Sequence, residues 1–290
     1  MALATPATGR ITAGTIRTGS LRTGGAELNW RADQATTTVI FVHGSFDDHT
    51  SWDQVVSLLP SNITAIRYDR RGHSRSSAPA GRANLYDHVG DLVSVITELA
   101  GGAAHVVGHS YGALVALMAA ARHPELVHSL LVHEPPAFSL LAGDPQGEQL
   151  RAEARAHVTT VAAHIEAGRR DEAVALFAEK VAFGPQWREL FPQPQRAMLA
   201  GNAHTFLDQF RDPDHYALDL EALATDRVPI TMTVGTIGPA TVLRSTQLLA
   251  DRLPAATVEA LAGAGHAPQL SHPDAFAAAL VRHLERVGRS

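Results

Sequence analysis

Cysteine is absent from the 290 residues of this chain. Disulfide bonds, thiol nucleophiles and cysteine-ligated zinc are therefore all excluded. A chain without disulfides suits a reducing compartment, and residues 1–14 lack the basic start and the apolar stretch of a secretory signal. We therefore expect a cytoplasmic protein.

Long apolar runs and clusters of basic residues are also missing. No window approaches the roughly 18 continuous apolar residues that a membrane span needs, so the membrane is not an expected partner. The net charge is only -5 and no basic block stands out, so nucleic acid is not an expected partner either. Hydrophobic residues make up 45% of the chain, which is enough for a full core.

Strand-like and helix-like segments alternate along most of the chain, which predicts an α/β fold with a mostly parallel sheet flanked by helices. Between residues 138 and 227 the pattern is helical throughout. We therefore predict a core of residues 14–137 and 228–290, an inserted helical cap at 138–227 and a flexible tail at 1–13. The expected strands cover residues 15–22, 26–32, 38–42, 63–68, 105–107, 127–132, 230–234 and 257–261, and the first two flank the hairpin signal Gly24-Gly25. Expected core helices cover residues 52–59, 85–99, 113–121, 241–253 and 273 onward.

A candidate nucleophile lies in the segment Gly108-His109-Ser110-Tyr111-Gly112, between an expected strand and an expected helix. A serine at such a sharp turn holds a strained backbone, and the residues two positions away must be small for the turn to close. The pattern alone occurs by chance in about one chain in ten of this length. Its context favours an exposed nucleophile over a serine that only caps the helix.

Backbone donors for an oxyanion are expected on both sides of this serine. Ester hydrolysis places negative charge on the carbonyl oxygen, and two N–H groups must already point at it. One donor is expected from Tyr111, and the other from the loop after the third strand, where Ser45 is the first candidate and Gly44 the second. His43 in that loop is expected to hydrogen-bond the loop and to do no chemistry.

The chain contains 16 histidines, so most of them must be structural. His266 differs because it follows the last expected strand on a Gly-rich loop. Active sites of open α/β sheets gather at the carboxyl ends of the strands, where His266 can reach Ser110 as its general base. Ordinary surface or turn positions are expected for His105, His109, His123, His128 and His133.

Four motifs in this order resemble those of the α/β-hydrolase superfamily: the His43-Gly44 loop, the turn at residues 68–74, the segment at 108–112 and the loop at 263–266. The resemblance covers residue 14 to the C-terminus and is specific for the fold, but not for the substrate, because this fold hosts many reactions. The turn at residues 69–74 is usually structural in such proteins, and we assign it no catalytic role. The expected chemistry requires no cofactor: no metal, flavin or nucleotide.

The triad acid is missing from its usual place in this fold, after the strand that follows the cap. The sequence has no Asp or Glu between Asp226 and Asp251, yet the imidazolium formed in catalysis needs a fixed anion. We predict Glu134 as the substitute, because it ends the strand beside the nucleophile strand and two prolines stiffen the following loop. The alternatives are a glutamate paired with an arginine at the cap entry, and a dyad without an acid.

A glutamate at this position is similar to the arrangement in haloalkane dehalogenases and in zearalenone-hydrolysing lactonases. The dehalogenases use aspartate as nucleophile, which Ser110 rules out. The lactonases use Ser, Glu and His in this order and are the closer match.

The sequence therefore predicts a serine hydrolase that cleaves an ester or lactone of a neutral, largely apolar small molecule. Few positions of the expected cap suggest a cationic clamp, and most of its large apolar residues are expected to pack its interior. Alternatives on the same residues are carbon–carbon bond hydrolysis and perhydrolysis. Alternatives of another class are a small-molecule-binding protein without turnover and a biosynthetic cyclase. The sequence leaves the oligomeric state open, including a homodimer.

Overall fold

The structure is a computed structural model that describes residues 17–32, 37–77, 81–214, 216–225 and 227–288. The expected tail at residues 1–13 and the start of the expected strand at 15–22 lie outside these residues. Among the described residues, no helix is both long enough and apolar enough to cross a membrane.

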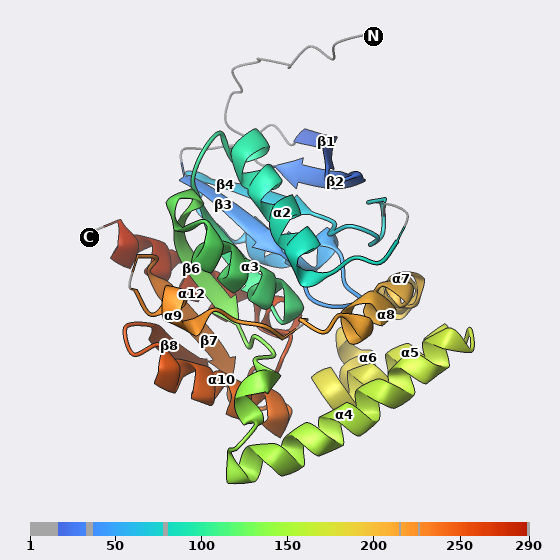
Figure 1. The fold of residues 1–290 in the computed structure, drawn as a ribbon. Helices are drawn as coiled ribbons and strands as arrows, with labels where there is room; N and C mark the ends of the chain where they lie inside the picture. Colours follow the sequence, from blue (N-terminus) through green and yellow to red (C-terminus); the bar gives the residue numbers. More distant parts are fainter. Residues whose placement is uncertain (1–16, 33–36, 78–80, 215, 226, 289–290) are drawn as a thin grey trace.

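A mostly parallel sheet of eight strands forms the centre of the fold (Figure 1). Its strand order is β1-β2-β4-β3-β5-β6-β7-β8, and the pairs β1–β2 and β2–β4 are antiparallel. The first pair is the expected hairpin, which turns at Gly24-Gly25 with φ of 49° and 79°. These findings confirm the predicted α/β-hydrolase fold. The strands are β1 (Arg17–Thr23), β2 (Ala26–Ala32), β3 (Thr37–Val42), β4 (Ile63–Tyr68), β5 (Ala104–His109), β6 (Val127–His133), β7 (Ile230–Gly235) and β8 (Thr257–Leu261).

Helices cover both faces of the sheet and build two apolar cores. Successive side chains of a strand point to opposite faces, so Ile40 and Val42 of β3 pack with α2 and α3, whereas Val39 and Phe41 pack with α1 and α12. The helices of this core are α1 (Asp53–Ser57), α2 (Leu85–Val95), α3 (Tyr111–Arg122), α9 (Leu220–Leu223), α10 (Ala240–Arg252), α11 (Pro268–Ser271) and α12 (Pro273–Val287).

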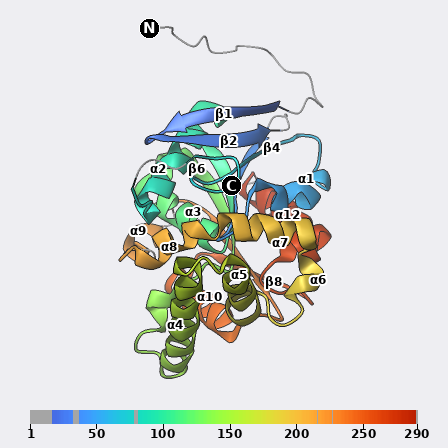
Figure 2. The same cartoon turned by 90° about the vertical axis from the view of Figure 1, so that its right-hand side faces the viewer.

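A helical layer lies between β6 and β7 in the chain and packs at one end of the sheet (Figures 1 and 2). Its helices share an apolar cluster of their own, which Phe46 joins from the loop after β3. The phenyl ring of Phe46 lies 5.1 Å from that of Phe206 and 4.7 Å from that of Phe177. This contact fixes the loop after β3 against the helical layer. The helices are α4 (Pro145–Glu166), α5 (Arg170–Leu176), α6 (Trp187–Leu190), α7 (Gln193–Asn202) and α8 (His204–Arg211).

Element boundaries differ from the expected ones mainly around the candidate nucleophile. β5 continues through Gly108 and His109, which pair with Val132 and His133 of β6. Glycine is depleted in strands, and the expected strand therefore stopped before Gly108. The expected helix at residues 52–59 is a 3-10 turn followed by α1, and the expected helix at 85–99 ends as α2 at Val95 and continues as a π-helical turn. β5 therefore ends at His109, the residue directly before Ser110.

Candidate active site

Ser110 occupies a strained turn between β5 and α3. Its φ of 53° and ψ of -123° lie outside the regions that ordinary side chains prefer. A Cβ on Gly108 would lie 2.6 Å from the Cα of Ala113, and a Cβ on Gly112 would lie 2.3 Å from the carbonyl oxygen of Val42. Both positions therefore require glycine, as the sequence predicted from the closing of the turn.

The tight contact at Gly112 gives a stability prediction. We expect Gly112→Ala to lower the free energy of unfolding by at least about 1–3 kcal/mol, because its methyl group would overlap backbone atoms that cannot move aside. The matched control is Gly90→Ala in α2, where an added Cβ meets nothing within 4 Å. We expect this control to be neutral or to stabilise by about 0.5–1 kcal/mol. Urea unfolding measures both, and equal effects would contradict the tight elbow.

His266 contacts Ser110 from the loop between β8 and α11. Its Nε2 lies 3.1 Å from the Ser110 Oγ, and the imidazole is buried. The backbone carbonyl of His266 accepts a hydrogen bond of 2.6 Å from Nε2 of His109. The structure thus brings the expected base to the expected nucleophile across 156 residues of sequence.

Glu134 contacts the other side of the same imidazole. Its Oε2 lies 2.7 Å from Nδ1 of His266, and its Oε1 accepts a hydrogen bond of 2.8 Å from the backbone N–H of Gly235. Gly235 ends β7, the strand whose following loop carries no carboxylate. The backbone at that end of the sheet therefore holds the carboxylate that β6 supplies. Glu134 itself has a φ of 44°, a second strained position in the site.

The buried carboxylate of Glu134 remains ionised. Burial opposes its charge, but neighbouring His133, which is charged only in acid, and the hydrogen bonds from His266 and Gly235 hold the pKa of Glu134 below its usual value. Burial lowers the pKa of His133 to about 4, so this imidazole is neutral near pH 7. At neutral pH the anion therefore depends on its two hydrogen bonds, and it fixes Nδ1 of His266 as a donor.

The loop after β3 passes directly against the nucleophile. A Cβ on Gly44 would lie 3.2 Å from the Cβ of Ser110. The carbonyl oxygen of Gly44 accepts hydrogen bonds from Arg70 Nη2 at 2.8 Å and from His43 Nδ1 at 2.9 Å. Since C=O and N–H of a trans peptide point in opposite directions, the N–H of Ser45 points away from Arg70. Ser45 and Tyr111 both line the cavity that contains Ser110 and His266.

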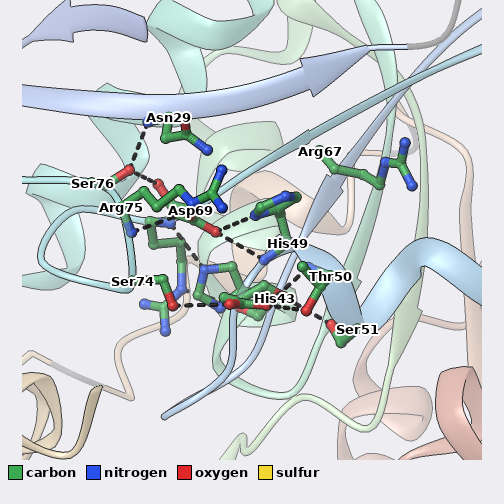
Figure 3. Close-up of polar contacts among 12 residues, drawn as sticks. Asn29, His43, His49, Thr50, Ser51, Arg67, Asp69, Ser74, Arg75 and Ser76 are labelled. Carbon is green, nitrogen blue, oxygen red and sulfur yellow. Dashed lines mark hydrogen bonds and ion pairs between the residues drawn. The ribbon is translucent and has the colours of Figure 1, made fainter. Parts of the chain in front are cut away.

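A network of polar contacts supports the loop after β3 (Figure 3). His43 accepts a hydrogen bond of 2.9 Å at Nε2 from the backbone N–H of Arg70, and burial lowers its pKa well below the usual value. The expected structural position of His43 is confirmed. Asp69 accepts hydrogen bonds from the backbone N–H and Nδ1 of His49, and Ser76 Oγ donates to the Asp69 carbonyl at 2.7 Å. The turn at residues 69–74 thus holds the loop in place.

Three residues that support the site were not predicted from the sequence. The expectation that His109 and His133 lie at the surface or in turns was wrong, because both side chains are buried in the site. His109 holds the backbone of His266, and burial lowers its pKa well below the usual value, so it is neutral. The buried guanidinium of Arg70 lies 5.1 Å from the Tyr111 ring and also holds Gly44. The sequence held a signal for the two histidines, because each one is the last residue of a strand that ends beside Ser110.

Two clusters of side chains have the spacing of metal ligands. They are His133, Glu134 and His266, and Asp48, His49 and Asp69. In the first, the carboxylate and Nδ1 of His266 are already hydrogen-bonded to each other. In the second, each carboxylate accepts hydrogen bonds from neighbouring backbone N–H groups. Both clusters are explained by these bonds, and we assign a metal to neither.

A small inner cavity at Ser110 adjoins a larger outer cleft. The inner one, of about 40 Å³, has room for only a few water molecules and contains Ser110 and His266. The outer cleft, of about 640 Å³, shares Phe138, Val158, Phe210 and Tyr216 with it. Arg151 and Arg155 of α4 line the outer cleft, where the sequence suggested few cationic positions.

Comparisons with known proteins define the class of this chain. The model of the alpha/beta hydrolase family matches residues 39–279, and the chain belongs to that family. The uncharacterized hydrolase YraK of Bacillus subtilis (strain 168) is 29% identical over 211 residues, which cover 69% of this chain and 70% of that protein. A hydrolase from Pseudomonas aeruginosa PA01 is similar in structure, with a TM-score of 0.75 and 26% identity over 94% of this chain and 99% of the other. The enol-lactonase from Burkholderia xenovorans LB400 shares the fold, with a TM-score of 0.70 and 20% identity over 92% of this chain and all of that one.

Proposed function

We propose that this hydrolase cleaves a carboxylic ester or lactone of a small molecule that is neutral and largely apolar beside the scissile bond, through an acyl-enzyme on Ser110. The observation that carries the proposal is the continuous contact from Ser110 Oγ to His266 Nε2, at 3.1 Å, and from His266 Nδ1 to Glu134, at 2.7 Å. A hydroxyl, an imidazole and a carboxylate in this sequence are the parts of a nucleophile, its base and the acid that orients the base.

The first half of the proposed reaction forms the acyl-enzyme. His266 Nε2 takes the proton of Ser110 while Oγ bonds to the carbonyl carbon, and the carbonyl electron pair moves onto its oxygen. The N–H groups of Ser45 and Tyr111 stabilise that oxyanion, and Glu134 stabilises the imidazolium. The oxyanion then re-forms the carbonyl, the bond to the alkoxide breaks, and His266 gives its proton to the leaving oxygen.

The second half returns the enzyme to its starting state. Water gives a proton to His266 Nε2 and bonds to the acyl carbon, and the same two N–H groups hold the second oxyanion. The bond between the carbon and Ser110 Oγ breaks, and His266 returns the proton to the serine. Every proton transfer in this cycle uses one nitrogen, so the fixed tautomer of His266 matters in both halves.

The lining of the inner cavity favours a substrate with an apolar group beside the scissile bond. Its walls are mainly the side chains of Phe138, Val158, Phe177, Phe206, Phe210 and Val242. Its small volume favours a compact acyl or lactone group there, with the remainder of the substrate in the outer cleft. At 20% identity, the likeness to the enol-lactonase supports the fold and not that substrate.

A substrate screen tests this proposal. Short-chain aryl esters, alkyl esters, lactones and a vinylogous diketone are each incubated with the wild type and with Ser110→Ala. We expect Ser110-dependent release of acid from an ester or a lactone. Cleavage of the diketone alone favours a carbon–carbon bond hydrolase, and peracid formation in hydrogen peroxide favours a perhydrolase. Binding without turnover of any of them favours a receptor or a cyclase, and each of these results would overturn the ester proposal.

A further inference from the structure

Gln209 of α8 brings a buried amide into the inner cavity. The residue is 5% exposed and lines that cavity together with Ser110 and His266. Its Oε1 accepts a hydrogen bond of 2.7 Å from the Ser45 hydroxyl. Among the residues that the structure describes, its buried Nε2 has no hydrogen-bond partner.

A buried amide donor without a partner is costly. Leaving such a group unpaired costs free energy comparable to a lost hydrogen bond, and native proteins rarely leave one without a reason. Most of the residues that line the cavity have apolar side chains, which offer no acceptor. The cavity has room for a few water molecules, and a substrate oxygen that takes the place of one of them would satisfy the donor.

We propose that Gln209 binds substrate and selects esters or lactones that carry a second oxygen acceptor close to the scissile carbonyl. The acceptor is a carbonyl, ether or hydroxyl oxygen, to which Nε2 of Gln209 donates. This inference rests on the proposed function and narrows its substrate class. An otherwise identical substrate with a methylene in place of that oxygen leaves the donor buried and unpaired, so it is disfavoured.

The bond from Ser45 gives the amide a defined orientation. Because the serine hydroxyl donates to Oε1, the amide nitrogen is the atom left for a ligand. Ser45 also supplies one of the proposed oxyanion donors, so Gln209 lies next to the reacting carbonyl. Phe206, one turn earlier on α8, packs on Phe46 and fixes the helix against the same loop. The donor is therefore held by both the helix and the loop.

Tyr111 offers a hydroxyl at the same cavity, and the test must distinguish its contribution to substrate binding from that of Gln209. Its hydroxyl also has no hydrogen-bond partner within the described part of the chain, and burial raises its pKa, so it remains neutral. Its ring packs against Arg70 and His88, which orients it. The variant Tyr111→Phe removes this hydroxyl and keeps the backbone N–H.

The test compares matched ester pairs that differ in one atom. On the acyl side, 4-nitrophenyl methoxyacetate is compared with 4-nitrophenyl butanoate. On the alcohol side, 2-methoxyethyl acetate is compared with butyl acetate. For each pair, the ratio of kcat/KM for the oxygen compound to that for the carbon compound is measured in the wild type and in Gln209→Leu. Differences in intrinsic reactivity within a pair cancel when the two ratios are compared.

We expect the ratio for at least one pair to fall by about tenfold in Gln209→Leu, the size of a net buried hydrogen bond. The matched control is Gln247→Leu, the same change at an exposed glutamine of α10, and it should leave both ratios unchanged. Equal losses for both members of each pair in Gln209→Leu would show a packing role and overturn the proposal. A fall in Tyr111→Phe with none in Gln209→Leu would overturn it as well, because the tyrosine would then bind the acceptor.

A binding measurement separates this inference from the proposed function. Ser110→Ala with and without Gln209→Leu is titrated with the same ester pairs, and the dissociation constants are compared. If the wild type hydrolyses none of the esters but the binding preference depends on Gln209, the ester proposal fails and the subsite stands. If the wild type hydrolyses them with a preference that ignores Gln209 in both rate and binding, the subsite fails and the ester proposal stands.

Discussion

Ser110→Ala is expected to lower kcat for the ester or lactone substrate by about 10⁴-fold or more. The variant removes the oxygen that would bond to the acyl carbon, and nothing else among the contacting groups can replace it. Substrate binding should persist, because the cavity walls are unchanged. Steady-state rates with the best substrate of the screen give the loss, and far-ultraviolet circular dichroism checks the fold.

His266→Ala is expected to cause a loss of the same size, because the serine hydroxyl is a weak nucleophile without its base. The double variant should be no worse than either single one, since the two residues act as one unit. The matched control is His128→Ala, an exposed histidine of β6, which should keep the wild-type rate.

Retention of more than about one per cent of the wild-type rate in Ser110→Ala would contradict covalent catalysis at Ser110.

Glu134→Gln is expected to lower kcat by about 10²- to 10⁴-fold while the fold stays intact. A glutamine amide can donate to Nδ1 of His266, which would leave the proton on Nε2 and present the wrong tautomer to Ser110. The matched control is Glu98→Gln, at an exposed position, which should have no effect on kcat. A near-wild-type rate for Glu134→Gln would reject the acid assignment and leave a Ser–His dyad.

The vacant position after β7 allows a sharper test of the carboxylate. The nearest atoms to a Cβ on Gly238 would be the Leu243 side chain, at 3.6 Å, and Oε1 of Glu134, at 4.0 Å. Gly238→Asp can therefore bring a carboxylate close to Nδ1 of His266. We expect the double variant Glu134→Ala, Gly238→Asp to be at least about tenfold faster than Glu134→Ala alone. Absence of any recovery, with both variants folded, would argue that Glu134 has a different role.

The proposed reacting residues were predictable because each had a local or ordering signal. Ser110 sits in a five-residue pattern whose glycines have steric reasons, and His266 follows the last strand. Glu134 came from elimination, since the usual position is empty, and the parallel pairing of β5 with β6 makes its reach to His266 possible. In these cases the topology of the sheet converts sequence order into proximity.

The surrounding residues were not predictable because their contacts join distant segments. Ser45 and Gln209 are 164 positions apart, and no periodicity relates a loop after β3 to a helix before β7. His109 and His266 are 157 positions apart and meet through a side chain and a backbone carbonyl. The sequence also could not place Arg151 and Arg155, because the wall of a cleft depends on how α4 lies across the core. Such details follow from packing, which one sequence does not encode locally.

Covalent labelling of the nucleophile tests most directly whether Ser110 is activated by His266 and Glu134. Folded wild-type protein is incubated with a fluorophosphonate, its intact mass is measured, and the modified peptide is sequenced. We expect one adduct, on Ser110, with none on Ser110→Ala and much slower labelling of His266→Ala. A folded wild type that takes up no probe, or that takes it up at another residue, would contradict an activated serine at this turn.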